Sequence, residues 1–88
     1  MTEQERQDLQ QQAEYGRKVE AAQEFLGDFL LRERTQTIFR LENCNADNIQ
    51  ELQSMVLYLQ CLSSFEKNMN AFIEIGELAE KELNENGQ

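Results

Sequence analysis

One stretch of the chain, residues 49–73, is apolar on nearly every side of the helix that it is predicted to form. Its main stripe recurs at steps of three and four residues, the spacing of one helix face, and comprises Met55, Tyr58, Leu62, Phe65, Met69, Phe72, Gly76, Ala79 and Leu83. A second set lies beside this stripe and comprises Ile49, Leu52, Val56 and Leu59, while Leu57 and Cys61 point to a further side. At about 100° per residue, one neighbouring helix cannot cover such a circumference. We therefore expect this segment to pack against its own chain on one side and against another copy or another protein on the other.

The only strong turn signal is Asn-Cys-Asn-Ala-Asp-Asn at residues 43–48, because Asn and Asp satisfy their own backbone and tolerate left-handed conformations. Asp47 and Gln50 have the spacing of a capping box, which predicts that the second helix begins near residue 48. The chain contains no proline. We predict one all-α domain, a long antiparallel helical hairpin with coiled-coil packing that associates into a helical bundle. Its predicted elements are a helix at 3–42, a turn at 43–47 and a helix at 48–84.

Glycines inside the predicted helices need a reason, since each costs about 1 kcal/mol relative to alanine. Gly27, followed by Asp28, either breaks or kinks the first helix, or lies at a close contact inside a continuous one. Folding the chain back on its turn places residue i roughly opposite residue 91 minus i. In that register Gly16 faces Gly76, and Gly27 faces the serines at 63–64. Small residues at these levels let two helices approach closely.

Composition and charge exclude several classes of function. The net charge of −9 disfavours nucleic acid and anionic membranes as direct ligands, and no apolar run approaches the roughly 18 residues of a membrane span. The first residues lack the basic and apolar regions of a signal peptide, so we expect a cytoplasmic protein. Histidine is absent, and Cys44 and Cys61 are expected roughly 20 Å apart, too far for a disulfide. Free thiols fit a reducing compartment.

Catalytic and metal-binding residues do not stand out. Ser54 and the serines at 63–64 have no histidine to activate them, and no glycine-rich phosphate loop is present. Glu74, Glu77 and Glu80 have a spacing that could chelate a hard cation, but such spacing on an acidic helix is typical of a solvated face. We predict no enzyme, no metal site and no cofactor.

Helix packing is the function that the pattern favours. We predict a non-enzymatic protein–protein interaction or assembly module that forms homo-oligomers and has a possible protein partner. The predicted interface residues are Met55, Val56, Leu57, Tyr58, Leu59, Leu62 and Phe65, with Leu31 and Phe39 from the first helix. The alternative is an acidic inhibitor or nucleic-acid mimic that binds a basic protein through its terminal carboxylates.

A resemblance supplies a biological setting. The residues that carry it are Gly16-Arg17, Ala22, Phe25-Leu26, Leu30, Leu52-Gln53, Ile73, Gly76 and Ala79-Glu80. Their order resembles that of short helical proteins encoded by tailed bacteriophages and prophages. The chain departs from that pattern in lacking an aromatic residue after Leu30 and a proline in the turn. Such proteins have no settled activity, so the resemblance implies a phage accessory or structural component in a bacterial host cell, without functional residues.

Overall fold

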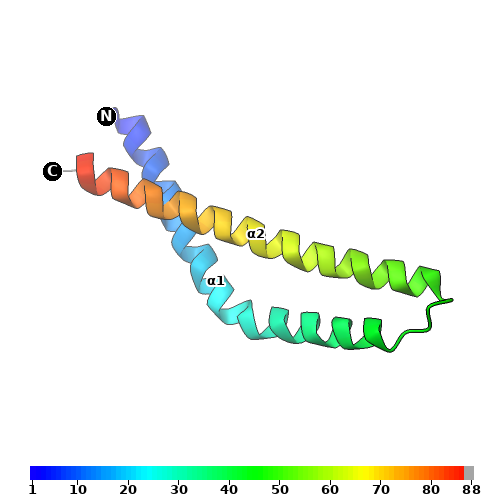
Figure 1. Ribbon diagram of the computed structural model, residues 1–88. Coiled ribbons are helices and arrows are strands. Elements are labelled where there is room, and N and C mark those ends of the chain that lie inside the picture. Colours follow the sequence, from blue (N-terminus) through cyan, green and yellow to red (C-terminus); the bar gives the residue numbers. More distant parts are fainter. Residues whose placement is uncertain (87–88) are drawn as a thin grey trace.

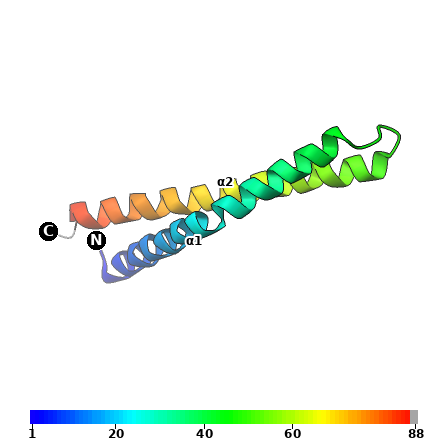
Figure 2. The same ribbon diagram turned by 90° about the horizontal axis from the view of Figure 1, so that it is seen from below.

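The computed structural model describes residues 1–86, which form two long helices, α1 (Glu3–Glu42) and α2 (Ile49–Asn86), joined by a short turn. Figure 1 shows the start of α1 and the end of α2 at one end of the hairpin and the turn at the other. The molecule measures 63 × 20 × 14 Å, and the view from below shows the same long, thin outline (Figure 2). The predicted all-α helical hairpin is confirmed. Its radius of gyration of 18.9 Å exceeds the roughly 12 Å of a compact chain of this length.

Side-chain caps fix where both helices begin. The Thr2 hydroxyl accepts a hydrogen bond from the backbone N–H of Glu5 at 3.1 Å, and the Asn48 side chain accepts one from the N–H of Glu51 at 3.3 Å. The Asn48 amide also donates to the Glu51 carboxylate, so these two residues form a reciprocal cap. Asp47 does not cap α2, contrary to the sequence prediction, because α2 begins at Ile49 and Asn48 takes the cap position. Asp47 lies in the turn, where its N–H donates to the Asn45 side chain.

The two helices meet along an interhelical seam with a period of 3.5 residues. On α2 the buried or half-buried positions alternate by three and four residues, and they are Leu52, Met55, Leu59, Leu62, Glu66, Met69, Ile73, Gly76 and Leu83, with Ala79 beside them. A 3.5-residue repeat keeps one stripe facing a partner helix, as in coiled coils. The centre of the seam is a cluster of Leu30, Leu62 and Met69, packed against Val19, Leu26 and Leu59.

Three aromatic residues predicted for the main stripe lie outside the seam. Tyr58, Phe65 and Phe72 are partly exposed on its flank, while Leu52, Leu59 and Ile73 fill the seam instead. Glu66 also enters the seam, where it forms an ion pair with Arg34. The prediction was wrong here because α2 carries two interleaved stripes with three- and four-residue spacing, and spacing alone does not decide which one faces α1.

The predicted contact between Gly16 and Gly76 is confirmed. A Cβ atom added to either glycine would lie 2.8 Å from the Cα of the other, so the two backbones touch where the helices cross near their free ends (Figure 1). Figure 1 also shows α1 changing direction near its middle, although it stays helical through Gly27. Of the alternatives expected at Gly27, the close contact is wrong, since a Cβ atom there would have no neighbour within 4 Å.

Candidate interaction face

All seven aromatic side chains of the protein lie at its surface. Their exposed fractions range from 39% for Tyr58 to 85% for Phe25. The buried apolar side chains of the seam are small or flexible, namely Ala13, Leu30, Met55, Leu62, Met69 and Ala79. The helices thus pack through a core without rings, and the largest apolar groups remain outside it.

Most of these rings gather on one side of the seam. On α2, Tyr58, Phe65 and Phe72 recur every seven residues and therefore share one flank. On α1, Tyr15 and Phe29 each precede a buried seam residue, Gly16 and Leu30, by one position. Contacts between the helices place these two flanks on the same side, as described below. We define the aromatic face as Tyr15, Phe29, Tyr58, Phe65, Phe72 and Ile75.

Two contacts across the hairpin join the halves of the aromatic face. The rings of Tyr15 and Phe72 meet edge to face, with centroids 5.1 Å apart and planes at 81°. The Tyr58 hydroxyl donates a hydrogen bond of 2.6 Å to the carboxylate of Glu33 on α1. A surface groove near the free ends is lined by Asp8, Gln11, Gln12, Tyr15, Phe72 and Ile75. The aromatic face is therefore built from both helices and depends on their register.

Polar pairs join the two helices on the other side of the seam, where exposed apolar side chains such as Leu31 and Val56 also lie. These cross-helix pairs are Arg17 with Glu80 at 3.2 Å, Gln23 with Asn70 at 2.6 Å and Arg34 with Glu66 at 3.0 Å. The pair of Arg34 and Glu66 is the most enclosed, with about a third of each side chain exposed. Partial removal from water strengthens such a pair relative to a fully exposed one. Polar bonds thus set the register of the two helices on the side opposite the rings.

The structure places the predicted interface residues in three environments. Met55 and Leu62 are buried in the seam of their own hairpin, and Leu59 is half-buried beside them. Tyr58 and Phe65 lie on the aromatic face, partly exposed. The remaining residues are exposed away from that face, on the polar side or the outer sides of the helices, and they are Leu31, Phe39, Val56 and Leu57. The predicted interface did not include Tyr15, Phe29, Phe72 or Ile75, although the seven-residue spacing of Phe72 from Phe65 was available as a signal.

Hydrogen bonding to Glu33 raises the pKa of Tyr58 above its usual value of 10.0, with smaller contributions from desolvation and from the charge of the carboxylate. Because the folded pKa exceeds the unfolded one, the stabilisation is fully present below about pH 10 and is lost as the pH rises through the folded pKa. In a Tyr15→Phe background, where Tyr58 is the only tyrosine, we expect Glu33→Gln to lower the midpoint of phenolate absorbance.

Glu24→Gln provides the matched control for this titration, because it removes an exposed carboxylate from the same helix. We expect it to leave the Tyr58 midpoint where it is. A midpoint that Glu33→Gln does not move would contradict the hydrogen bond as the cause.

The remaining surface offers little for chemistry. Cys44 and Cys61 are free thiols, and desolvation together with the nearby Glu51 carboxylate raises the pKa of Cys44, which disfavours its thiolate. Cys61 is exposed, although the nearby Leu59 is half-buried and Leu62 is buried. No group of His, Cys, Asp or Glu within residues 1–86 is arranged to hold a metal ion. Neither α1 nor α2, over the residues described, contains a stretch apolar and long enough to cross a lipid bilayer.

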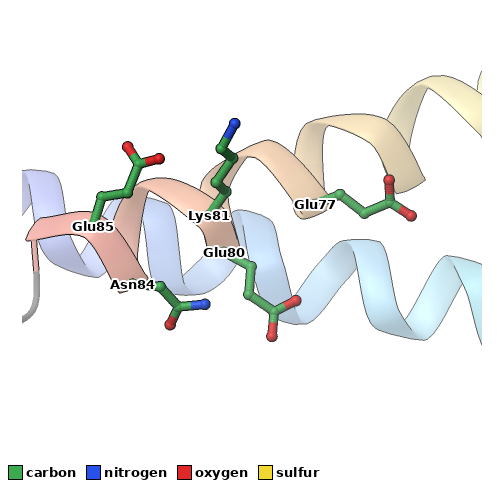
Figure 3. A pocket seen from close by; sticks show the side chains of 5 residues that line it. All are labelled: Glu77, Glu80, Lys81, Asn84 and Glu85. Carbon is green, nitrogen blue, oxygen red and sulfur yellow. The ribbon is translucent and has the colours of Figure 1, made fainter.

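A shallow depression near the end of α2 is lined by Glu77, Glu80, Lys81, Asn84 and Glu85. Figure 3 shows these side chains spreading away from the helix in different directions instead of converging on one point. Glu80 is paired with Arg17. The depression is thus an open, mainly acidic surface.

No protein-family model, curated protein or solved structure matches this chain.

Proposed function

We propose that this protein is a non-enzymatic assembly module that associates with itself through the aromatic face to form a helical bundle. The observation that carries this proposal is the exposure of five aromatic side chains on one face of the hairpin. Aromatic side chains bury about 150–250 Å² each when packed and dominate the energetics of cores and interfaces. A surface that gathers several of them on one side is typical of a protein–protein contact site.

The surface area of the chain supports the same proposal. The hairpin exposes 6823 Å², whereas a folded monomer of this mass exposes roughly 5,400 Å². The excess of about 1,400 Å² is larger than the roughly 800 Å² that each partner buries in a standard protein interface. Burying one standard interface on the aromatic face would therefore remove more than half of this excess.

The resemblance to short helical phage proteins supports a setting for this module. In the proposed setting it acts as an accessory or structural component of a tailed phage, in the cytoplasm of a bacterial host. The two free thiols, Cys44 and Cys61, fit a reducing compartment. The setting rests on the order of residues in the sequence alone.

An acidic inhibitor of a basic protein is the second candidate. The observation that favours it is the distribution of charge. The terminal half of the hairpin, residues 1–24 and 65–88, carries twelve acidic and five basic side chains, a net charge of −7. The turn half, residues 25–64, carries five acidic and three basic side chains, a net charge of −2. The concentration of negative charge on the terminal half attracts basic partners electrostatically.

Molar mass in solution tests the proposed function. We expect sedimentation equilibrium over a hundredfold range of concentration to show a dimer that dissociates on dilution. Raising NaCl from about 0.1 M to 1 M shortens the Debye length from about 10 Å to 3 Å, which weakens repulsion between two acidic chains while apolar contacts persist. The dimer is therefore expected to be as stable or more stable at high salt. A monomer at every concentration and salt would overturn the proposal.

A further inference from the structure

We infer that two hairpins pair through their aromatic faces with opposite orientation, so that the turn half of each covers the terminal half of the other. The twofold axis passes beside Ala22 of α1 and Asn68 of α2. This inference rests on the proposed self-association. It adds that a second copy of the chain covers the aromatic face, in which orientation it does so, and which residues lie at the centre of the interface.

Charge decides between the two orientations that a twofold axis allows. Pairing with the turns at the same end would bring two terminal halves of net charge −7 together. Opposite pairing places each of them against a turn half of net charge −2. The hairpin is 63 Å long, many times the Debye length of about 8 Å at physiological salt. Only halves that face each other therefore interact strongly, and the opposite orientation avoids the largest repulsion.

The positions of the rings point to the same arrangement. Tyr15 and Phe29 lie equally far from Ala22, seven residues on either side. With the axis at Ala22, Phe29 of one chain meets Tyr15 of the other. There it reaches the surface groove that Tyr15, Phe72 and Ile75 line. Phe29 is 55% exposed within its own hairpin, so it has side-chain surface to place in that groove.

The same axis places a polar residue at the centre of the contact between the α2 helices. Asn68 is exposed on α2 next to the aromatic flank of Phe65 and Phe72, and the axis brings it opposite its counterpart in the second chain. Two such amides can donate and accept hydrogen bonds with each other. A single asparagine within an apolar helix interface is known to fix register, since a shifted register leaves it without a partner. Ala22 and Asn68 also lie roughly opposite each other in the hairpin, because residue i lies roughly opposite residue 91 minus i.

The width of the hairpin varies in a way that suits opposite pairing. Near the free ends the backbones touch at Gly16 and Gly76, and the seam there contains Ala13 and Ala79. Farther along, the seam is filled by larger side chains such as Leu62. Small residues bring helix axes closer together than large ones. Opposite pairing therefore sets the narrow part of each hairpin against the wide part of the other.

Cysteine cross-linking tests this orientation in a Cys44→Ser, Cys61→Ser background. With opposite pairing, Asn68→Cys should cross-link to itself in the dimer through a disulfide or a short bis-maleimide, and so should Ala22→Cys. An equimolar mixture of the two variants should give no cross-link between position 22 and position 68. Pairing with the turns together reverses this pattern, because each α1 then lies over the α2 of the other chain.

The native cysteine supplies the control. With the axis at Asn68, Cys61 lies opposite residue 75 of the second chain, roughly 20 Å along the helix from its own counterpart. Cys44→Ser alone, which keeps Cys61, should therefore not cross-link to itself. A sedimentation dimer with cross-links only between positions 22 and 68 overturns the orientation while leaving the proposed function intact. A monomer by sedimentation overturns the proposed function itself.

Discussion

Phe65→Asp is expected to separate the dimer into monomers and to lower the melting temperature of the protein. Phe65 lies in the middle of the aromatic stripe on α2 and is 47% exposed within the hairpin. Burying one large apolar side chain is worth about 1.5–3 kcal/mol, and a twofold interface contains each position twice. Because about half of the Phe65 side chain is already covered within its own hairpin, the loss is about 1.5–3 kcal/mol per dimer, a rise of about 10- to 10²-fold in the dissociation constant.

Phe39→Asp is the matched control for this experiment. Phe39 is 65% exposed and lies two residues after the buried Thr37, on the outer side of α1. The same chemical change at this position should leave the dissociation constant within a few-fold of the wild-type value in sedimentation. Equal disruption by both variants would place the interface elsewhere, and so would a Phe65→Asp chain that keeps its dimer on dilution.

Gly16→Ala and Gly76→Ala are expected to destabilise the fold by about 1–3 kcal/mol. The added methyl group would lie 2.8 Å from the Cα of the facing glycine and 3.1 Å from a backbone carbonyl oxygen. Backbone atoms cannot rotate away as a flexible side chain can, so the helices have to separate and the neighbouring seam loosens. This cost exceeds the gain of about 1 kcal/mol in helix propensity. Urea unfolding at a fixed protein concentration measures the difference.

Gly27→Ala is the control for the glycine variants, because it makes the same change in the same helix as Gly16→Ala. Its methyl group would meet nothing within 4 Å, so only the gain in helix propensity, up to about 1 kcal/mol, remains. We expect this variant to unfold at a higher urea concentration than the wild type. A Gly16→Ala chain that is as stable as Gly27→Ala would contradict the close backbone contact.

The sequence predicts the hairpin well because few signals compete with it. One cluster of Asn and Asp residues marks the turn, and the absence of proline leaves both helices uninterrupted. Folding the chain back on that turn is enough to bring Gly16 opposite Gly76, as the structure has it. The same arithmetic fails at Gly27, because Leu26 and not Gly27 lies on the side of α1 that packs against the core.

The composition of the face is harder to obtain from the sequence. On α2, the stripe of Leu52, Leu59 and Ile73 and the stripe of Tyr58, Phe65 and Phe72 follow the same seven-residue repeat, although Glu66 takes one position of the first stripe. Which one faces α1 depends on side chains of the other helix. The partner of Glu66 is Arg34, thirty-two positions away, and no local pattern on α2 indicates that a charged residue belongs in the seam.

A core without rings has a spectroscopic consequence. Near-ultraviolet circular dichroism reports on aromatic side chains held in asymmetric surroundings, whereas the far-ultraviolet signal reports on helical backbone. Since Phe and Tyr are absent from the buried positions, the encounter of two molecules adds to the near-ultraviolet signal that the Tyr15–Phe72 contact gives within one hairpin, whereas the far-ultraviolet signal follows helix formation. Dilution of the protein can therefore separate the two events in a single cuvette.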